Sequence, residues 1–136
     1  MKPERLAELH RACFVTPPPW NTAAFEVFLA DKTVFLVPHA HGFLLARSVL
    51  DQAEILTLAV DPAHRRLGIA AQMVAEFHRK ARLCGAVGAF LEVAVDNTEA
   101  SSLYKSKGYD QIGHRKNYYA APNAQKIDAL VMQYPL

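Results

Sequence analysis

The sequence predicts an α/β fold in which a mixed β-sheet carries helices on its faces. Segments rich in branched and aromatic residues alternate with segments whose apolar residues recur at helical spacing. A long helical pattern over residues 68–83 connects two apolar strands, so these two strands should run parallel. Short turns at residues 38–42 and 51–52 should instead reverse the chain between antiparallel strands.

The first third of the chain predicts two helices followed by a hairpin. Residues 3–14 should form a helix, because proline is favoured in the first turn and apolar residues follow at helical spacing. The proline triplet 17–19 must end that helix, and Asn21 can cap a second one. Strands are expected over residues 33–37 and 43–50.

The remainder alternates strands with helices. The expected elements are a strand over 53–60, a helix over 68–83, a strand over 86–95, a helix over 98–107, and strands over 109–118 and 128–134. Gly85 and Gly108 should end the two helices, since glycine suits the left-handed position after a helix. Asn97 should cap the second of them. No repeat or linker divides the chain, so we expect one domain over residues 1–136.

The composition narrows the class of protein. The 136 residues are 51% hydrophobic and 21% charged, which is typical of a globular chain. A net charge of +2 is too small to indicate nucleic-acid binding. Neither a secretory signal nor a membrane span is visible, and we expect a cytoplasmic protein without membrane association. Cys13 and Cys84 should then be reduced and buried.

The stretch Ile55 to Ala71 carries the strongest functional signal. An apolar strand ends in a turn at Asp61, and Arg65, Arg66 and Gly68 lead into a helix. Such a loop leaves backbone N–H groups unpaired at the positive end of a helix dipole, which favours a diphosphate. The stretch lacks the Gly-Lys-Ser/Thr of a P-loop and the three glycines of a dinucleotide fingerprint.

Two side chains are candidates for proton transfer. Glu92 is the lone carboxylate of an apolar strand, where burial is costly unless the charge is paired or hydrated. It can be a general base, or a residue satisfied by solvent or by a neighbouring arginine. Tyr104 can be a general acid or a half-buried aromatic residue. His39 and His41 have no further ligand nearby in sequence, so no metal is expected.

Several motifs together resemble one family. Arg65-x-x-Gly68-x-Ala70 resembles the acetyl-coenzyme A (acetyl-CoA) loop of the GCN5-related N-acetyltransferases (GNAT). The segments 90–97, 100–109 and 115–119 extend the resemblance across roughly residues 14–135. Within the family, the chain is most similar to bacterial enzymes that acetylate the N-terminal alanine of ribosomal proteins. The resemblance implies a GNAT acyl-CoA N-acyltransferase fold, here apparently lacking the first edge strand.

The resemblance also implies roles for individual residues. Glu92 would be the general base and Tyr104 the general acid. Acetyl-CoA, a co-substrate, would be bound by Leu58, Ala59, Val60, Arg65, Arg66, Leu67, Gly68, Ile69, Ala70, Ala71 and Asn97. The peptide substrate would be bound by Trp20, Tyr118 and Tyr119.

The expected activity is transfer of acetyl from acetyl-CoA to a protein N-terminal α-amine, with a ribosomal protein as one candidate partner. Two alternatives stay open at this point. The acceptor can be a lysine or a small-molecule amine, or the protein can bind acyl-CoA as a sensor without turnover. The expected assembly is a monomer or a homodimer, because an unpaired sheet edge can be covered by a second copy.

Overall fold

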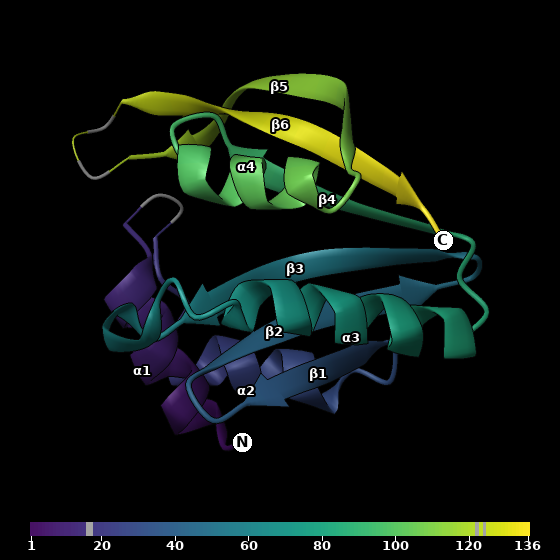
Figure 1. Ribbon diagram of the computed structural model, residues 1–136. Helices are drawn as coiled ribbons and strands as arrows, with labels where there is room; N and C mark the ends of the chain where they lie inside the picture. The colour runs from purple at the N-terminus through teal and green to yellow at the C-terminus, as the bar shows by residue number, and fades with distance from the viewer. Residues whose placement is uncertain (16–17, 122, 124) are drawn as a thin grey trace.

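Six strands form one mixed sheet in the order β1-β2-β3-β4-β6-β5 (Figure 1). Its strands are β1 (Val34–His39), β2 (Gly42–Val49), β3 (Gln52–Val60), β4 (Gly88–Ala94), β5 (Asp110–Ala120) and β6 (Lys126–Pro135). β3 and β4 are parallel, and the other neighbouring strands are antiparallel. This computed structural model describes residues 1–15, 18–121, 123 and 125–136, and it confirms the expected fold class.

The helices also lie close to their expected positions. They are α1 (Pro3–Cys13), α2 (Thr22–Ala30), the 3-10 helix η1 (Pro62–His64), α3 (Ile69–Leu83) and α4 (Thr98–Ser106). The side chains of Asn21 and Asn97 cap α2 and α4 by accepting backbone N–H bonds of 2.9 and 3.2 Å. Of the proline triplet expected to end α1, Pro17 lies outside the described residues.

Two details differ from the sequence-based expectation. β5 continues to Ala120 instead of giving way to a loop at Tyr119, because Tyr119 and Ala120 pair with Ile127 and Lys126 of β6. The expectation that both thiols are buried is also wrong. Cys84 follows the last turn of α3 and is exposed, whereas Cys13 is partly buried and donates its Sγ–H to the Val60 carbonyl at 3.2 Å.

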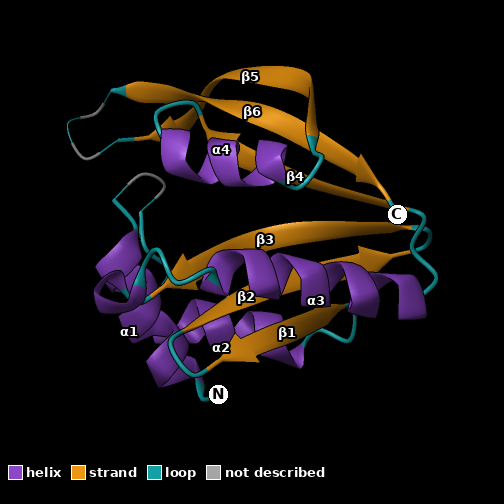
Figure 2. Ribbon diagram, in the orientation of Figure 1, coloured by secondary structure: helices purple, strands orange, loops and turns teal. Residues whose placement is uncertain are grey.

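The two faces of the sheet carry different helices (Figure 2). α3 and α4 pack on one face, where Leu44 and Ala46 of β2 join their apolar cluster. α1 and α2 pack on the other face, against Phe43 and Leu45. All four β2 residues are fully buried, because successive side chains point to opposite faces of a strand covered on both sides.

β3 and β4 remain paired over only part of their length. Residues Gln52–Ile55 pair with Gly88–Leu91, and beyond them the two strands diverge (Figure 1). A β-bulge coincides with the divergence, since Leu45 pairs with Thr57 while Ala46 pairs with Ile55. A bulge increases local twist, which bends β3 away from β4.

The outer limits of the described fold are simple. β1 is one edge of the sheet, and within the described ranges the first element is α1. None of the described helices is both long and apolar enough to cross a membrane.

Two buried histidines link distant segments. His10 is 1% exposed, and its Nε2 lies 2.9 Å from the Thr57 hydroxyl. His78 lies 2.7 Å from the Tyr109 hydroxyl and stacks on Tyr134 at 4.6 Å between ring centroids. Burial lowers the pKa of each of these histidines from 6.5 to about 4, because a buried imidazolium loses its hydration.

Acidification should therefore destabilise the fold between pH 6.5 and 4, since in that range the unfolded chain binds more protons than the folded protein. His78→Phe keeps a ring at the stacking position and removes one titrating group. We expect its free energy of unfolding to fall less steeply over this window, by up to about 1.4 kcal/mol per pH unit. Urea unfolding at several pH values measures the slope. Equal slopes in both proteins would contradict the assignment.

Candidate active site

A cavity of about 400 Å³ opens where β3 and β4 diverge. Of the residues expected at the site, those that line it are Trp20, Leu58, Ala59, Val60, Arg65, Arg66, Gly68, Ile69, Ala70, Ala71, Glu92, Asn97, Tyr104 and Tyr119. Leu67 and Tyr118 are not among the lining residues, and their side chains are exposed. The divergence of two strands thus brings together residues from both halves of the chain.

The loop before α3 has the backbone shape expected of an anion site. Arg66 and Gly68 both adopt left-handed conformations, with φ of 63° and 76°. No side chain among the described residues caps α3, so its first-turn N–H groups remain available to a ligand. Alternation of such left-handed residues creates a concave backbone surface, and the arginine charges add to the helix dipole. The loop therefore fits a diphosphate.

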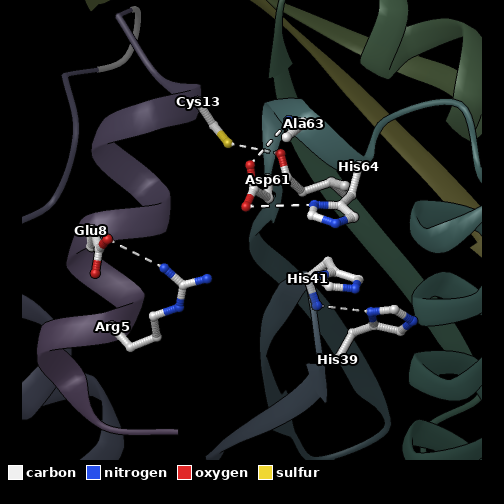
Figure 3. A network of polar contacts seen from close by, with 9 residues as sticks. Arg5, Glu8, Cys13, His39, His41, Asp61, Ala63 and His64 are labelled. Carbon is white, nitrogen blue, oxygen red and sulfur yellow. Dashed lines mark hydrogen bonds and ion pairs between the residues drawn. The ribbon is translucent and has the colours of Figure 1, made fainter.

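Side chains from two turns hold this loop (Figure 3). Asp61 accepts the Ala63 N–H at 3.0 Å and lies 3.6 Å from His64 Nδ1. The His64 ring stacks on His41 of the β1–β2 turn, with centroids 3.6 Å apart and planes 4° from parallel. His39 Nδ1 in turn accepts the His41 N–H at 3.1 Å. Nothing in the sequence predicted that this turn lies beside the loop.

Glu92 lies on the face of β4 opposite α4. Its neighbours Leu91 and Val93 belong to the α3–α4 cluster, so the alternating side chain points the other way. The Glu92 side chain is only 16% exposed, and its Oε1 lies 3.1 Å from Nε of Arg115. Of the interpretations left open by the sequence, pairing with an arginine is the arrangement observed.

Further ionisable groups surround this carboxylate. The nearby Glu92 carboxylate is the main reason why the pKa of Tyr118 is raised. Burial, and secondarily the Glu92 charge, raises the pKa of Glu54 on β3. The face of β3 and β4 opposite α4 therefore carries two carboxylates, with the Arg115 guanidinium beside one of them.

Tyr104 reaches the cavity from the other face. It is 6% exposed, and its ring packs edge to face against Tyr109 with centroids 5.7 Å apart. Burial holds the pKa of the Tyr104 phenol well above its ordinary value, so the hydroxyl stays protonated. Among the hydrogen bonds between described residues, none involves this hydroxyl. The proton can therefore be donated to a bound molecule.

Aromatic residues form a wall of the cavity near α1. Trp20 stacks on His10 and Phe28, with centroid distances of 5.0 and 4.9 Å. The Trp20 backbone N–H also donates to His10 Nδ1 at 2.9 Å, so neutral His10 carries its proton on Nε2, toward Thr57. Sequence reasoning missed His10, although it falls in the same helical stripe as Leu6.

On the β5–β6 side of the cavity, a bulge in β5 shapes the site. The β5–β6 register shifts between Arg115 and Tyr119, and Asn117 is left-handed with φ of 53°. Asp128 holds the bulge by accepting the Asn117 N–H at 2.8 Å. Tyr119 is half-buried there, and burial raises its pKa to about 12.

Comparison with known proteins adds three findings. The model of the Acetyltransferase (GNAT) family matches residues 4–109. A ribosomal protein bS18-alanine N-acetyltransferase of Haemophilus ducreyi is 37% identical over 91 residues, which cover 67% of this chain and 63% of that protein. The N-alpha-acetyltransferase RimI of Mycobacterium tuberculosis is 35% identical, over 96% of this chain and 84% of that protein.

A solved structure is similar over nearly the whole chain. Arabidopsis thaliana NAA60 in complex with acetyl-CoA superposes with a TM-score of 0.84 at 22% identity, covering 99% of this chain and 93% of that one. At this level of identity, the likeness concerns the fold. In the Haemophilus alignment, the chain spans less than two thirds of the relative's length.

Proposed function

We propose a reaction for this chain, which belongs to the acetyltransferase (GNAT) family by the family match over residues 4–109. The reaction transfers acetyl from acetyl-CoA to the α-amine of a protein N-terminus, and a ribosomal protein that begins with alanine is the candidate substrate. One observation carries the proposal: a carboxylate and a protonated phenol from opposite faces of the sheet share a cavity with an anion-binding loop. The bS18-alanine acetyltransferase and RimI relatives support it.

The residues of the chain fit acetyl-CoA. The diphosphate would lie against the loop of Arg65, Arg66 and Gly68 and the first turn of α3. The amide-bearing arm would pair with the free edge of β3 at Leu58–Val60, as an added strand does. Asn97, which lines the same cavity, would contact the arm from the other side. The side chain of Leu67 is exposed, so only its backbone would contribute.

Bound acetyl-CoA supplies an activated thioester, and the chain supplies position and proton transfer. The new amide bond forms as the carbon–sulfur bond breaks, so an ammonium nitrogen must lose two protons while sulfur gains one. Glu92 would accept the first proton from the amine, directly or through water, and release it to solvent. Tyr104 would donate a proton to sulfur, and the second proton lost by nitrogen would restore the phenol. Holding both reactants in one cavity would supply a large part of the acceleration.

A polypeptide terminus fits the cavity walls better than the two alternatives. Trp20, which precedes α2, and Tyr119 of β5 would flank the first residues of a peptide. Tyr118 would lie at the mouth of the cavity. A small-molecule amine would leave these aromatic surfaces without a partner. A sensor would have no use for two proton-transfer groups at one cavity. We further propose that residues 1–136 act as one domain in the cytoplasm, as a monomer or a homodimer.

The reaction is tested by release of free thiol from acetyl-CoA with an alanine-initiated peptide. A matched peptide has a blocked N-terminus, so that its internal lysine carries the only free amine. We expect thiol release and a mass increase at the N-terminus only with the free α-amine. Equal reaction of the blocked peptide would favour lysine acetylation, and binding of acetyl-CoA without any thiol release would favour the sensor.

The loop assignment predicts a selective loss of coenzyme A binding in Gly68→Val. Gly68 and Gly85 both have positive φ, and neither would place a Cβ within 4 Å of another residue. Valine should therefore strain either position by about 1–2 kcal/mol. Only Gly68 lines the cavity, so we expect about tenfold weaker binding in Gly68→Val and unchanged binding in Gly85→Val. Calorimetry with coenzyme A measures both, and equal affinities would refute the loop assignment.

The phenol assignment predicts a defect in turnover. Tyr104→Phe should lower kcat by about 10²-fold while leaving coenzyme A affinity nearly intact. Tyr109→Phe is the matched control, because its hydroxyl bonds His78 outside the cavity lining. The control should lose about 1 kcal/mol of stability and keep its kcat. A Tyr104→Phe protein with wild-type turnover would exclude the general-acid role.

A further inference from the structure

The Arg115–Glu92 ion pair creates a conflict with the proposed reaction, on which this inference rests. The guanidinium Nε lies 3.1 Å from Glu92 Oε1, within hydrogen-bonding distance. A carboxylate bonded in this way already has the cation that a substrate ammonium would otherwise provide. A protonated amine can approach this oxygen closely only after the guanidinium moves away, because two cations at the same oxygen repel each other.

The two partners differ in their freedom to move. The Glu92 side chain is 16% exposed and projects from β4 inside the sheet, whereas the Arg115 side chain is 55% exposed and comes from edge strand β5. The Arg115 guanidinium carbon also lies 5.3 Å from the centre of the Tyr118 ring. An aromatic face attracts a cation, so this contact, which coexists with the ion pair, can retain the guanidinium when it leaves the carboxylate.

The charges around Glu92 favour replacement of one cation by another. The facing ionisable groups are Glu54 on β3 and Arg115, Tyr118 and Tyr119 on β5. Both tyrosines are neutral at neutral pH, since the ordinary pKa of a phenol is about 10 and their surroundings raise it further. Loss of Arg115 without a substitute would leave Glu92 unpaired near a second half-buried carboxyl group, which is costly. A substrate ammonium restores the balance.

We propose that Arg115 is a displaceable counter-ion of Glu92, and that the N-terminal ammonium of the substrate takes its place. The ion pair keeps the base satisfied in the free enzyme and opposes substrate binding by the free energy needed to break it. The site consequently selects a terminus that arrives as a cation. Arg115 acts through Glu92, so it is a positioning residue whose effect should appear in substrate affinity.

The proposal is tested by calorimetry of an alanine-initiated peptide with protein saturated with coenzyme A, which has no acetyl group to transfer. Arg115→Gln should bind the peptide about three- to tenfold more tightly than the wild type, since no ion pair must then be broken. Arg115→Lys keeps a cation and should bind with near wild-type affinity. Lys116→Gln removes the same charge from the adjacent residue and should leave affinity unchanged.

Each other outcome has a defined meaning. Weaker peptide binding by Arg115→Gln would overturn the proposal and show that the guanidinium contacts the substrate. Unchanged binding would also overturn it, because breaking the ion pair would then contribute nothing. Thermal melting of each variant verifies folding, and equal coenzyme A affinity verifies the cofactor half of the cavity. Failure of the proposed function is distinguishable, since the wild type would then release no thiol with the peptide.

Discussion

The site depends on the interruption of pairing between β3 and β4. Were the parallel ladder to continue past Ile55, the strands would close over the space that the cavity occupies. The bulge in β3 and the helices packed on each half of the sheet keep β3 and β4 apart. His10 contributes from α1, because its bond to Thr57 fastens that helix to the diverging part of β3. An unpaired strand edge is normally a liability, and here a ligand that carries amides can satisfy it.

The same separation sets the electrostatics of the site. Glu92 and Tyr104 belong to opposite faces of the sheet, so each is buried among different neighbours. Tyr104 lies among apolar and aromatic groups, which keep the phenol protonated. Glu92 lies among ionisable groups and bonds to Arg115. The proposed base and the proposed acid can therefore coexist in one cavity, because their surroundings differ.

Features determined by short stretches of chain were predicted well. Asn21, Asn97 and Gly85 lie at helix ends as expected, because a cap depends on residues within one turn. The loop at Gly68 was equally visible, since its backbone shape depends on a few adjacent residues. The exposure of Cys84 was mispredicted, because the burial of a residue at a helix end depends on which side of the helix faces the sheet. A shift of two residues along the helix changes that side.

The sequence by itself determined the order of the elements, the backbone shape of the loop before α3 and the two candidates for proton transfer. Only the tertiary structure decided the partner of Glu92, the support of Trp20 by His10, and the stacking of His41 on His64. The cavity, the Glu92–Arg115 ion pair and the His41–His64 stack each join groups from separate elements. The hydrogen bond between His10 and Thr57 spans 47 residues of sequence. Local propensity carries no information about such contacts, because packing brings their partners together.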